Sequence, residues 1–144
     1  MTDKIADLPE NYRPSDNEEY MNDLQLEYFR RKLLSWRRSL LSEFNKTVVN
    51  LGKQNLNESD LGDRASVESE VSFELRTRDR YRKLLKKIDA ALQRVRTRHY
   101  GFCAKTFEPI GIKRLEARPV ATLGVNAQEE YERTKRMYTD KWDD

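Results

Sequence analysis

Residues 55–63 read NLNESDLGD, a run of Asn, Ser, Asp and Gly that is typical of a turn. A long segment lies on each side of it, and in both segments apolar residues recur at steps of three and four, which indicates one face of a helix. The stripe before the turn consists of Leu33, Trp36, Leu40, Phe44, Val48 and Leu51. The stripe after it consists of Val67, Val71, Leu75, Tyr81, Leu84, Leu85, Ile88, Ala91, Leu92 and Val95.

This pattern predicts a mainly α fold, built on a long antiparallel helical hairpin of the coiled-coil type. We expect the hairpin over residues 18–98, with its tip near residues 55–65. Residues 1–17 contain two prolines and are expected to be a flexible segment, in which Ser15 or Asp16 could cap the first helix. Residues 99–144 should form a small module and a C-terminal helix that pack with the start of the first helix.

The composition supports an elongated helical protein. Charged and hydrophobic residues each make up 37% of the chain, and Gly and Pro are scarce. A two-helix seam needs only a narrow apolar stripe, so this composition suits it. The single cysteine excludes an internal disulfide, and no apolar run reaches membrane-spanning length. We therefore expect a cytoplasmic monomer that is not bound to a membrane.

Charges are segregated along the second helix. Its start and the preceding turn are acidic, and the rest of it, from Arg76 to Arg98, is strongly basic. A helix dipole favours this order on any solvated helix. The functional alternative is a hairpin with a negative tip and a positive shaft. Phosphates would repel such a tip, so the order favours insertion into a mixed-charge protein site over binding along DNA.

Three further stretches carry a family resemblance. Residues 101–127 read GFCAKTFEPIGIKRLEARPVATLGVNA, residues 75–80 read LRTRDR and continue into RKLLKKI at 82–88, and residues 18–22 read EEYMN. These stretches resemble the DksA/TraR family, and specifically its zinc-less DksA type. The resemblance implies a cytoplasmic bacterial transcription regulator without enzymatic activity. Such a protein binds RNA polymerase at its rim and secondary channel, and reads no DNA sequence.

The resemblance also implies a role for the tip. In the family, an acidic tip of pattern Asp-x-x-Asp-x-Ala approaches the polymerase active centre, and Asp60, Asp63 and Ala65 match that pattern. Open complexes at ribosomal RNA promoters would be destabilised as a result. The alternative is that Asp60 and Asp63 only cap the second helix.

A second implied site binds guanosine tetraphosphate (ppGpp), which acts with the family in the stringent response at the interface with the polymerase rim. The matching positions are Arg80, Leu84, Lys87 and Arg118. The first three are spaced by four and three residues and so share one face of a helix. Gln128 stands where the family usually has a lysine, and it lacks the positive charge.

Many members of the family hold a structural zinc with two C-x2-C pairs. Here the spacing is present but the residues are Cys103, Thr106, Gly124 and Ala127. One thiol cannot complete a tetrahedral zinc site, and His99 does not supply the missing ligands. The sequence therefore predicts a zinc-finger-like module that lacks zinc. Cys103 is expected to be a small buried residue, with redox sensing as the alternative.

Other classes of protein fit less well. No pattern for a nucleophile elbow or a phosphate-binding loop is present, which speaks against an enzyme. An unrelated coiled-coil interaction module would explain the apolar stripes but not residues 101–127. A basic nucleic-acid-binding protein would explain the positive charge but not the acidic tip.

Overall fold

The structure is a computed structural model that describes residues 3–57 and 64–142. The described residues form four α-helices, and an isolated antiparallel bridge joins Phe102 to Pro109. The helices are α1 (Asp23–Asn57), α2 (Arg64–Arg96), α3 (Ile112–Ala117) and α4 (Val125–Trp142). The mainly α fold expected from the sequence is confirmed.

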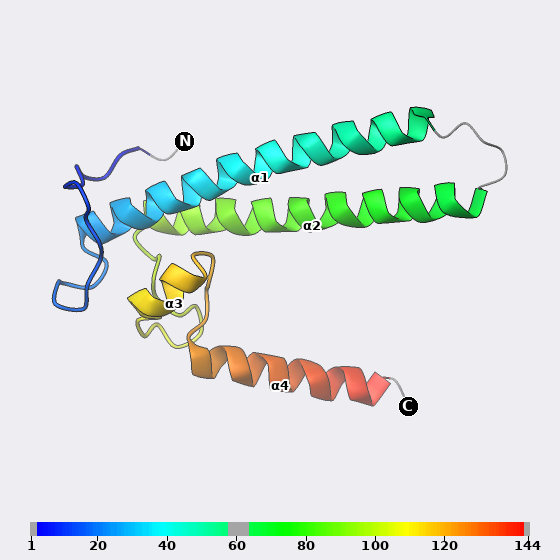
Figure 1. The fold of residues 1–144 in the computed structure, drawn as a ribbon. Helices are drawn as coiled ribbons and strands as arrows, with labels where there is room; N and C mark the ends of the chain where they lie inside the picture. Colours follow the sequence, from blue (N-terminus) through cyan, green and yellow to red (C-terminus); the bar gives the residue numbers. More distant parts are fainter. Residues whose placement is uncertain (1–2, 58–63, 143–144) are drawn as a thin grey trace. The chain divides into compact units, whose positions relative to one another are not determined.

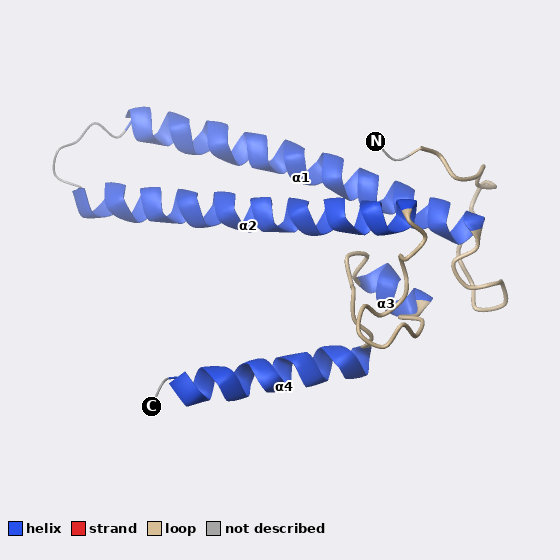
Figure 2. Ribbon diagram, turned by 180° about the vertical axis from the view of Figure 1, so that it is seen from behind, coloured by secondary structure: helices blue, strands red, loops and turns tan. Residues whose placement is uncertain are grey.

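The chain divides into two compact units. Unit 1 contains Met1–Leu33 and Ala90–Asp144, and unit 2 contains Leu34–Asp89. In each unit, a stretch of α1 lies side by side with an antiparallel stretch of α2 (Figures 1 and 2). The expected helical hairpin is therefore present, and α3 and α4 follow it within unit 1.

The first helix starts at Asp23 rather than near Glu18, and Asn22 caps it instead of Ser15 or Asp16. The Asn22 side chain accepts a hydrogen bond of 2.9 Å from the Gln25 N–H, and the Gln25 side chain accepts one of 2.8 Å from the Met21 N–H. This exchange resembles a capping box. Met21 has a φ of 53°, a left-handed conformation that no helix continues, so the helix cannot begin earlier.

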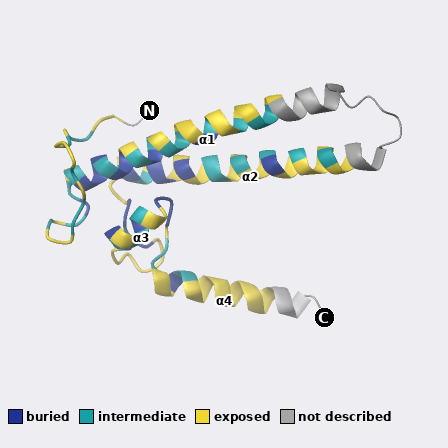
Figure 3. Cartoon of the chain, viewed as in Figure 1, coloured by how far each residue is buried: buried dark blue, intermediate teal, exposed yellow. Residues whose placement is uncertain are grey.

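In unit 2, the seam between the two helices is apolar over only part of its length. Leu40 and Ile88 are buried, and the rings of Phe44 and Tyr81 lie 5.4 Å apart. Nearer the turn, the buried position of α2 is Thr77. Figure 3 shows the resulting mixture of intermediate and exposed residues along both helices.

The apolar stripe expected for the second helix is wrong at two positions near the turn. Val71 and Leu75 were placed on its buried face, but both are exposed. The half-buried positions are Glu70 and Glu74. Residues four apart advance by about 40° around a helix beyond a full turn, so the 67, 71, 75 series drifts away from a seam that alternates steps of three and four.

Unit 1 holds most of the apolar core. Phe29 and Leu33 are completely buried on α1, and the Phe29 ring lies 5.6 Å from the ring of Tyr100, just after α2. Leu115 of α3 is also completely buried. Apart from its first turn, which buries Ala127, the described part of α4 is largely exposed (Figure 3). The core that holds the small module is thus packed by side chains from α1, α2 and α3.

Glu27 ties the N-terminal segment to α1. Its carboxylate is completely buried, and it accepts hydrogen bonds from the Ile5 N–H at 2.8 Å, from Arg30 at 2.8 Å and from Arg31 at 2.7 Å. Burial by itself raises the pKa of Glu27. The hydrogen bonds from Arg30, Ile5 and Arg31 outweigh it and lower the pKa to about 2.

We predict a stability change between about pH 4.5 and pH 2 that depends on Glu27. Its pKa in the folded chain lies below its ordinary value of 4.5, so the stabilisation is complete above that value and is lost as the pH falls toward 2. The loss should be on the order of 2 kcal/mol. Urea unfolding at a series of pH values measures it, and Glu27→Gln should remove this part of the pH dependence. Glu43→Gln, at an exposed position of the same helix, should keep it; equal pH profiles for native protein and Glu27→Gln would contradict the prediction.

Candidate functional site

Of the three residues predicted for the tip, only Ala65 lies within the described residues. Asp60 and Asp63 fall outside the described residues, and Ala65 is the second residue of α2. The predicted role of the acidic tip therefore stays a prediction.

Three of the four residues predicted to bind ppGpp lie on α2 in unit 2. Arg80 and Lys87 are exposed, and Leu84 is half-buried between them. Their spacing of four and three residues gives one helix face. In the described part of the chain, neither Arg80 nor Lys87 forms an ion pair. This face therefore presents two available cations around an apolar side chain.

Three acidic residues of α2 in unit 2 pair with basic neighbours. Glu74 pairs with Arg78 at 2.6 Å, Asp79 pairs with Lys83 at 3.0 Å, and Asp89 pairs with Arg37 of α1 at 2.8 Å. Several other exposed cations have no acidic partner among the described residues, and so the outer surface of α2 is positive. They are Arg76, Arg80, Arg82, Lys86 and Lys87.

The fourth predicted residue, Arg118, belongs to unit 1. It follows α3, is exposed, and donates its backbone N–H to the carbonyl of Arg114 at 2.8 Å. Gln128 lies on α4, where its side-chain amide donates to Glu132 at 3.1 Å. Whether Arg118 acts together with the three residues on α2 stays a prediction.

Three of the four positions that the sequence aligns with zinc ligands lie close together in the small module. The Cys103 N–H donates to the Glu108 carbonyl at 2.8 Å, and the Cys103 carbonyl accepts from the Phe107 N–H at 2.8 Å. Thr106 and Gly124 both donate hydrogen bonds to the Cys103 sulfur. Ala127 is buried in the first turn of α4. The structure thus brings Cys103, Thr106 and Gly124 together.

Backbone and side-chain donors surround the sulfur of Cys103. Burial by itself raises the pKa of the thiol. Hydrogen bonds from the Thr106 hydroxyl and from the N–H groups of Gly124, Thr106 and Lys105 outweigh burial and lower the pKa to about 7. The thiol is nevertheless only 2% exposed. The expectation of a buried cysteine is confirmed, and its donors are mostly backbone groups that no residue pattern reveals.

Sequence reasoning missed the junction between α2 and the small module. The Tyr20 hydroxyl donates to the Gly101 carbonyl at 2.6 Å and accepts from the Gly111 N–H at 2.9 Å. Gly101 has a φ of 89°, and a Cβ there would lie 2.7 Å from the Met21 side chain. Only glycine fits this conformation and this close approach. The stretch EEYMN at residues 18–22 carried part of the family resemblance, but nothing in the sequence indicated that its Tyr20 fixes this junction.

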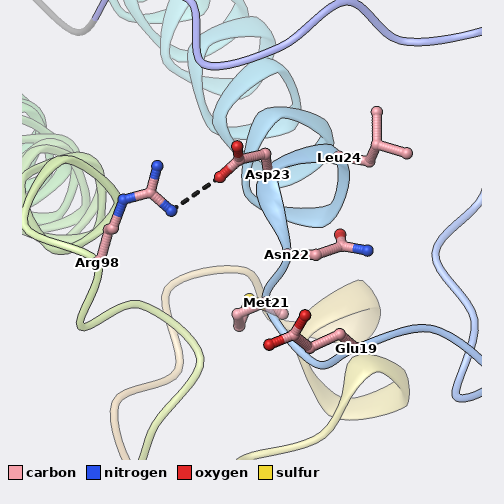
Figure 4. A pocket seen from close by; sticks show the side chains of 6 residues that line it. All are labelled: Glu19, Met21, Asn22, Asp23, Leu24 and Arg98. Atoms are coloured by element: carbon pink, nitrogen blue, oxygen red, sulfur yellow. Dashed lines mark hydrogen bonds and ion pairs between the residues drawn. The ribbon is translucent and has the colours of Figure 1, made fainter.

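An open hollow in unit 1 contains none of the predicted site residues. It has a volume of about 440 Å³ and lies where α1 begins and α2 has ended. In Figure 4 the guanidinium of Arg98 points toward the carboxylate of Asp23, and the two pair at 2.8 Å. The lining residues are Glu19, Met21, Asn22, Asp23, Leu24 and Arg98.

A metal-binding group and a membrane-spanning helix are both absent from residues 3–57 and 64–142. No group of three or more His, Cys, Asp or Glu side chains there is arranged to hold a metal ion. None of the described helices combines the length and apolar character needed to cross a bilayer.

The fold defines a helical-hairpin protein with a small C-terminal module. Residues 25–95 match the family described as "DnaK suppressor protein DksA, N-terminal domain". Two similar proteins are both named RNA polymerase-binding transcription factor DksA. The one from Caulobacter vibrioides is 55% identical over 130 residues, which cover 90% of this chain and 92% of the relative. The one from Escherichia coli K12 is 45% identical over 119 residues, covering 83% and 79%.

A solved structure agrees with these matches. Transcription factor DksA2 from Pseudomonas aeruginosa superposes with a TM-score of 0.74 at 41% identity, covering 81% of this chain and 90% of that one. Because the relatives are this similar over most of their length, the chain belongs to the DksA family.

Proposed function

We propose that this protein binds RNA polymerase and regulates transcription, and that it has no catalytic activity of its own. The observation that carries the proposal is the similarity, over nine-tenths of the chain, to a protein named for binding RNA polymerase. The hairpin is physically suited to this function, as are the cations of α2 that have no acidic partner among residues 3–57 and 64–142. It would act as a monomer in the cytoplasm, where the polymerase works.

The hairpin would enter the polymerase through its secondary channel. The cations of α2 that have no acidic partner would lie against acidic protein surface, and the tip with Asp60, Asp63 and Ala65 would lead toward the active centre. A negative leading end would be repelled by DNA phosphates, which favours a protein site. Acidic side chains carried on a helical support could perturb mobile elements near the active centre without filling it.

Promoter selectivity would come from each promoter's own kinetics rather than from DNA contacts. If the hairpin shifts the polymerase–promoter complex toward a less stable state, short-lived open complexes lose most. Ribosomal RNA promoters would be inhibited, and promoters limited by an earlier step, such as those of amino-acid biosynthesis, would be favoured.

ppGpp would bind at the polymerase rim against Arg80, Leu84, Lys87 and Arg118. Arg80 and Lys87, two exposed cations that form no ion pair with the described residues, are suited to phosphate oxygens, and Leu84 offers an apolar contact between them. ppGpp would then strengthen the effect by a coupling of about 1–3 kcal/mol. Gln128 donates to Glu132 and carries no charge, so its contribution to phosphate binding would be small.

The small module would fold without zinc. The Cys103 sulfur accepts hydrogen bonds from its neighbours, and the residues at the other three positions of the zinc spacing, Thr106, Gly124 and Ala127, are not zinc ligands. Buried side chains such as Tyr100, Ile112 and Leu115 supply the packing that a metal would otherwise provide.

The first prediction concerns the tip. Asp63→Asn keeps the helix-capping ability of the residue and removes only its charge. We expect the affinity for core polymerase to stay within about fivefold of the native value, because the proposed role of Asp63 is in the effect on transcription and not in anchoring the hairpin. Inhibition of a ribosomal promoter in single-round in vitro transcription should be lost. If binding and inhibition fall together, Asp63 has a structural or binding role instead.

The second prediction concerns ppGpp. Lys87→Ala should weaken ppGpp binding to the polymerase complex by about tenfold, because a charge-assisted contact to phosphate is lost. Lys86→Ala is the matched control: it is equally exposed but points about 100° away around the helix. Titration of transcription with ppGpp measures both. An unchanged response in Lys87→Ala, or an equal loss in Lys86→Ala, would remove Lys87 from the site.

The third prediction concerns zinc. Purified protein should contain far less than one equivalent of zinc by elemental mass spectrometry, and a strong chelator should leave its thermal unfolding unchanged. Stoichiometric zinc, or unfolding by the chelator, would show that the module is a metal site after all.

One experiment separates this function from the two rivals. Pull-down of core polymerase should succeed, while a gel shift on promoter DNA should show weak, nonspecific binding at most. A DNA-binding protein would give the reverse, with steep salt dependence. An unrelated coiled-coil module would bind neither.

A further inference from the structure

Four apolar side chains of unit 2 point into solvent near the turn of the hairpin. They are exposed by 53% (Val49), 43% (Val71), 57% (Phe73) and 60% (Leu75). Single exposed apolar residues are ordinary on any protein. A group of four in a chain with as many charged as hydrophobic residues is informative, because so little apolar material is available.

These four side chains do not hold the hairpin together. The seam at the same level of α2 contains Thr77, which is buried, and Glu74, which is half-buried and paired with Arg78. Here the hydrophobic residues face outward while polar residues face the partner helix. That arrangement lowers the stability of the isolated hairpin, since apolar burial is the main term that favours two-helix packing.

The four residues point in several directions. Val71 and Leu75 are four apart and share one side of α2, whereas Phe73 lies about 160–200° away from them around the helix. Val49 is nine residues from the buried Leu40 of α1, which places it on the side of α1 that faces away from the seam. A flat partner could cover only one of these sides. Apolar groups on three sides fit a partner that surrounds the hairpin.

The surface changes from apolar to cationic along α2. The apolar residues occupy about 6 Å of helix, and the stretch from Arg76 to Lys87 that follows spans about 16 Å. Its cations that pair with no acidic residue in the described part of the chain are Arg76, Arg80, Arg82, Lys86 and Lys87. Charge complementarity therefore requires a partner whose wall is apolar at one level and acidic at the next.

We propose that Val49, Val71, Phe73 and Leu75 form an apolar collar that is buried against a channel-shaped wall of RNA polymerase when the hairpin enters. This inference rests on the proposed function and adds the anchoring residues to it. The collar contributes affinity, and the tip contributes the effect on transcription. The exposed apolar groups are then the part of the interface that must lose water on binding.

The test replaces the two sides of the collar that lie on α2 by glutamine, which keeps bulk and is a good helix former. One variant carries Val71→Gln and Leu75→Gln, the second carries Phe73→Gln, and Val125→Gln is the matched control. Val125 is exposed by 53%, as Val49 is, but lies on α4 in unit 1. Affinity for core polymerase is measured by fluorescence anisotropy of the full-length labelled protein, with urea unfolding and sedimentation velocity beside it.

Both collar variants should bind core polymerase about tenfold more weakly or worse, with native stability, while the control binds like the native protein.

Native affinity in both variants would overturn the collar while leaving the proposed function intact. A loss in only one of them would indicate a flat contact and overturn the surrounding wall. An equal loss in the control would make the effect nonspecific, and a native dimer that the variants dissolve would make the collar a self-association surface. Failure of the native protein to bind polymerase would instead overturn the proposed function.

Discussion

The Tyr20 hydroxyl holds together three segments of unit 1 that are distant in sequence. It joins the loop before α1 to Gly101, just after α2, and to Gly111, just before α3. Gly101 has no side chain, and Met21 occupies the space that one would need. The arrangement fixes where the second helix passes into the small module. Tyr100, next to Gly101, extends the junction into the core: its ring packs near Phe29, and its hydroxyl donates to the Pro119 carbonyl at 2.7 Å.

In this module, long basic side chains repeatedly donate hydrogen bonds to backbone carbonyls. Arg94 donates to the Phe102 carbonyl at 2.6 Å, and Arg114 donates to the Leu123 carbonyl at 3.0 Å. Lys32 of α1 pairs with Glu116 of α3 at 2.5 Å. Arg94 and Arg114 each connect a helix to an irregular stretch, whereas Lys32 joins two helices. A module of this size has few apolar residues of its own, so such connections supplement its packing.

Periodicity predicted the existence of the long helices well and their faces less well. The two stripes and the NLNESDLGD turn indicated the hairpin, and the C-terminal helix expected within residues 99–144 is present as α4 (Val125–Trp142). The start of α1 was missed because the left-handed backbone of Met21 leaves no trace in the residue pattern. The outward position of Leu75 was missed because a series of fours looks like a stripe over three residues but drifts around the helix.

At the candidate site, too, one part could be predicted from the sequence and another could not. Arg80, Leu84 and Lys87 could be placed on one face from spacing alone, since all three lie on one uninterrupted helix. The donors around Cys103 could not be foreseen, because most are backbone N–H groups whose direction depends on the fold of the loop. Resemblance supplied the correspondence of Cys103 with a zinc position, and only the structure showed what surrounds its sulfur.

The polar seam of unit 2 also bears on how the two helices find their alignment. A hairpin with apolar residues at every facing position could slide by a heptad at little loss. The buried Thr77 makes such a displaced alignment unfavourable, because sliding would set its hydroxyl against an apolar neighbour. Lower stability near the turn is thus accompanied by a preference for a single register.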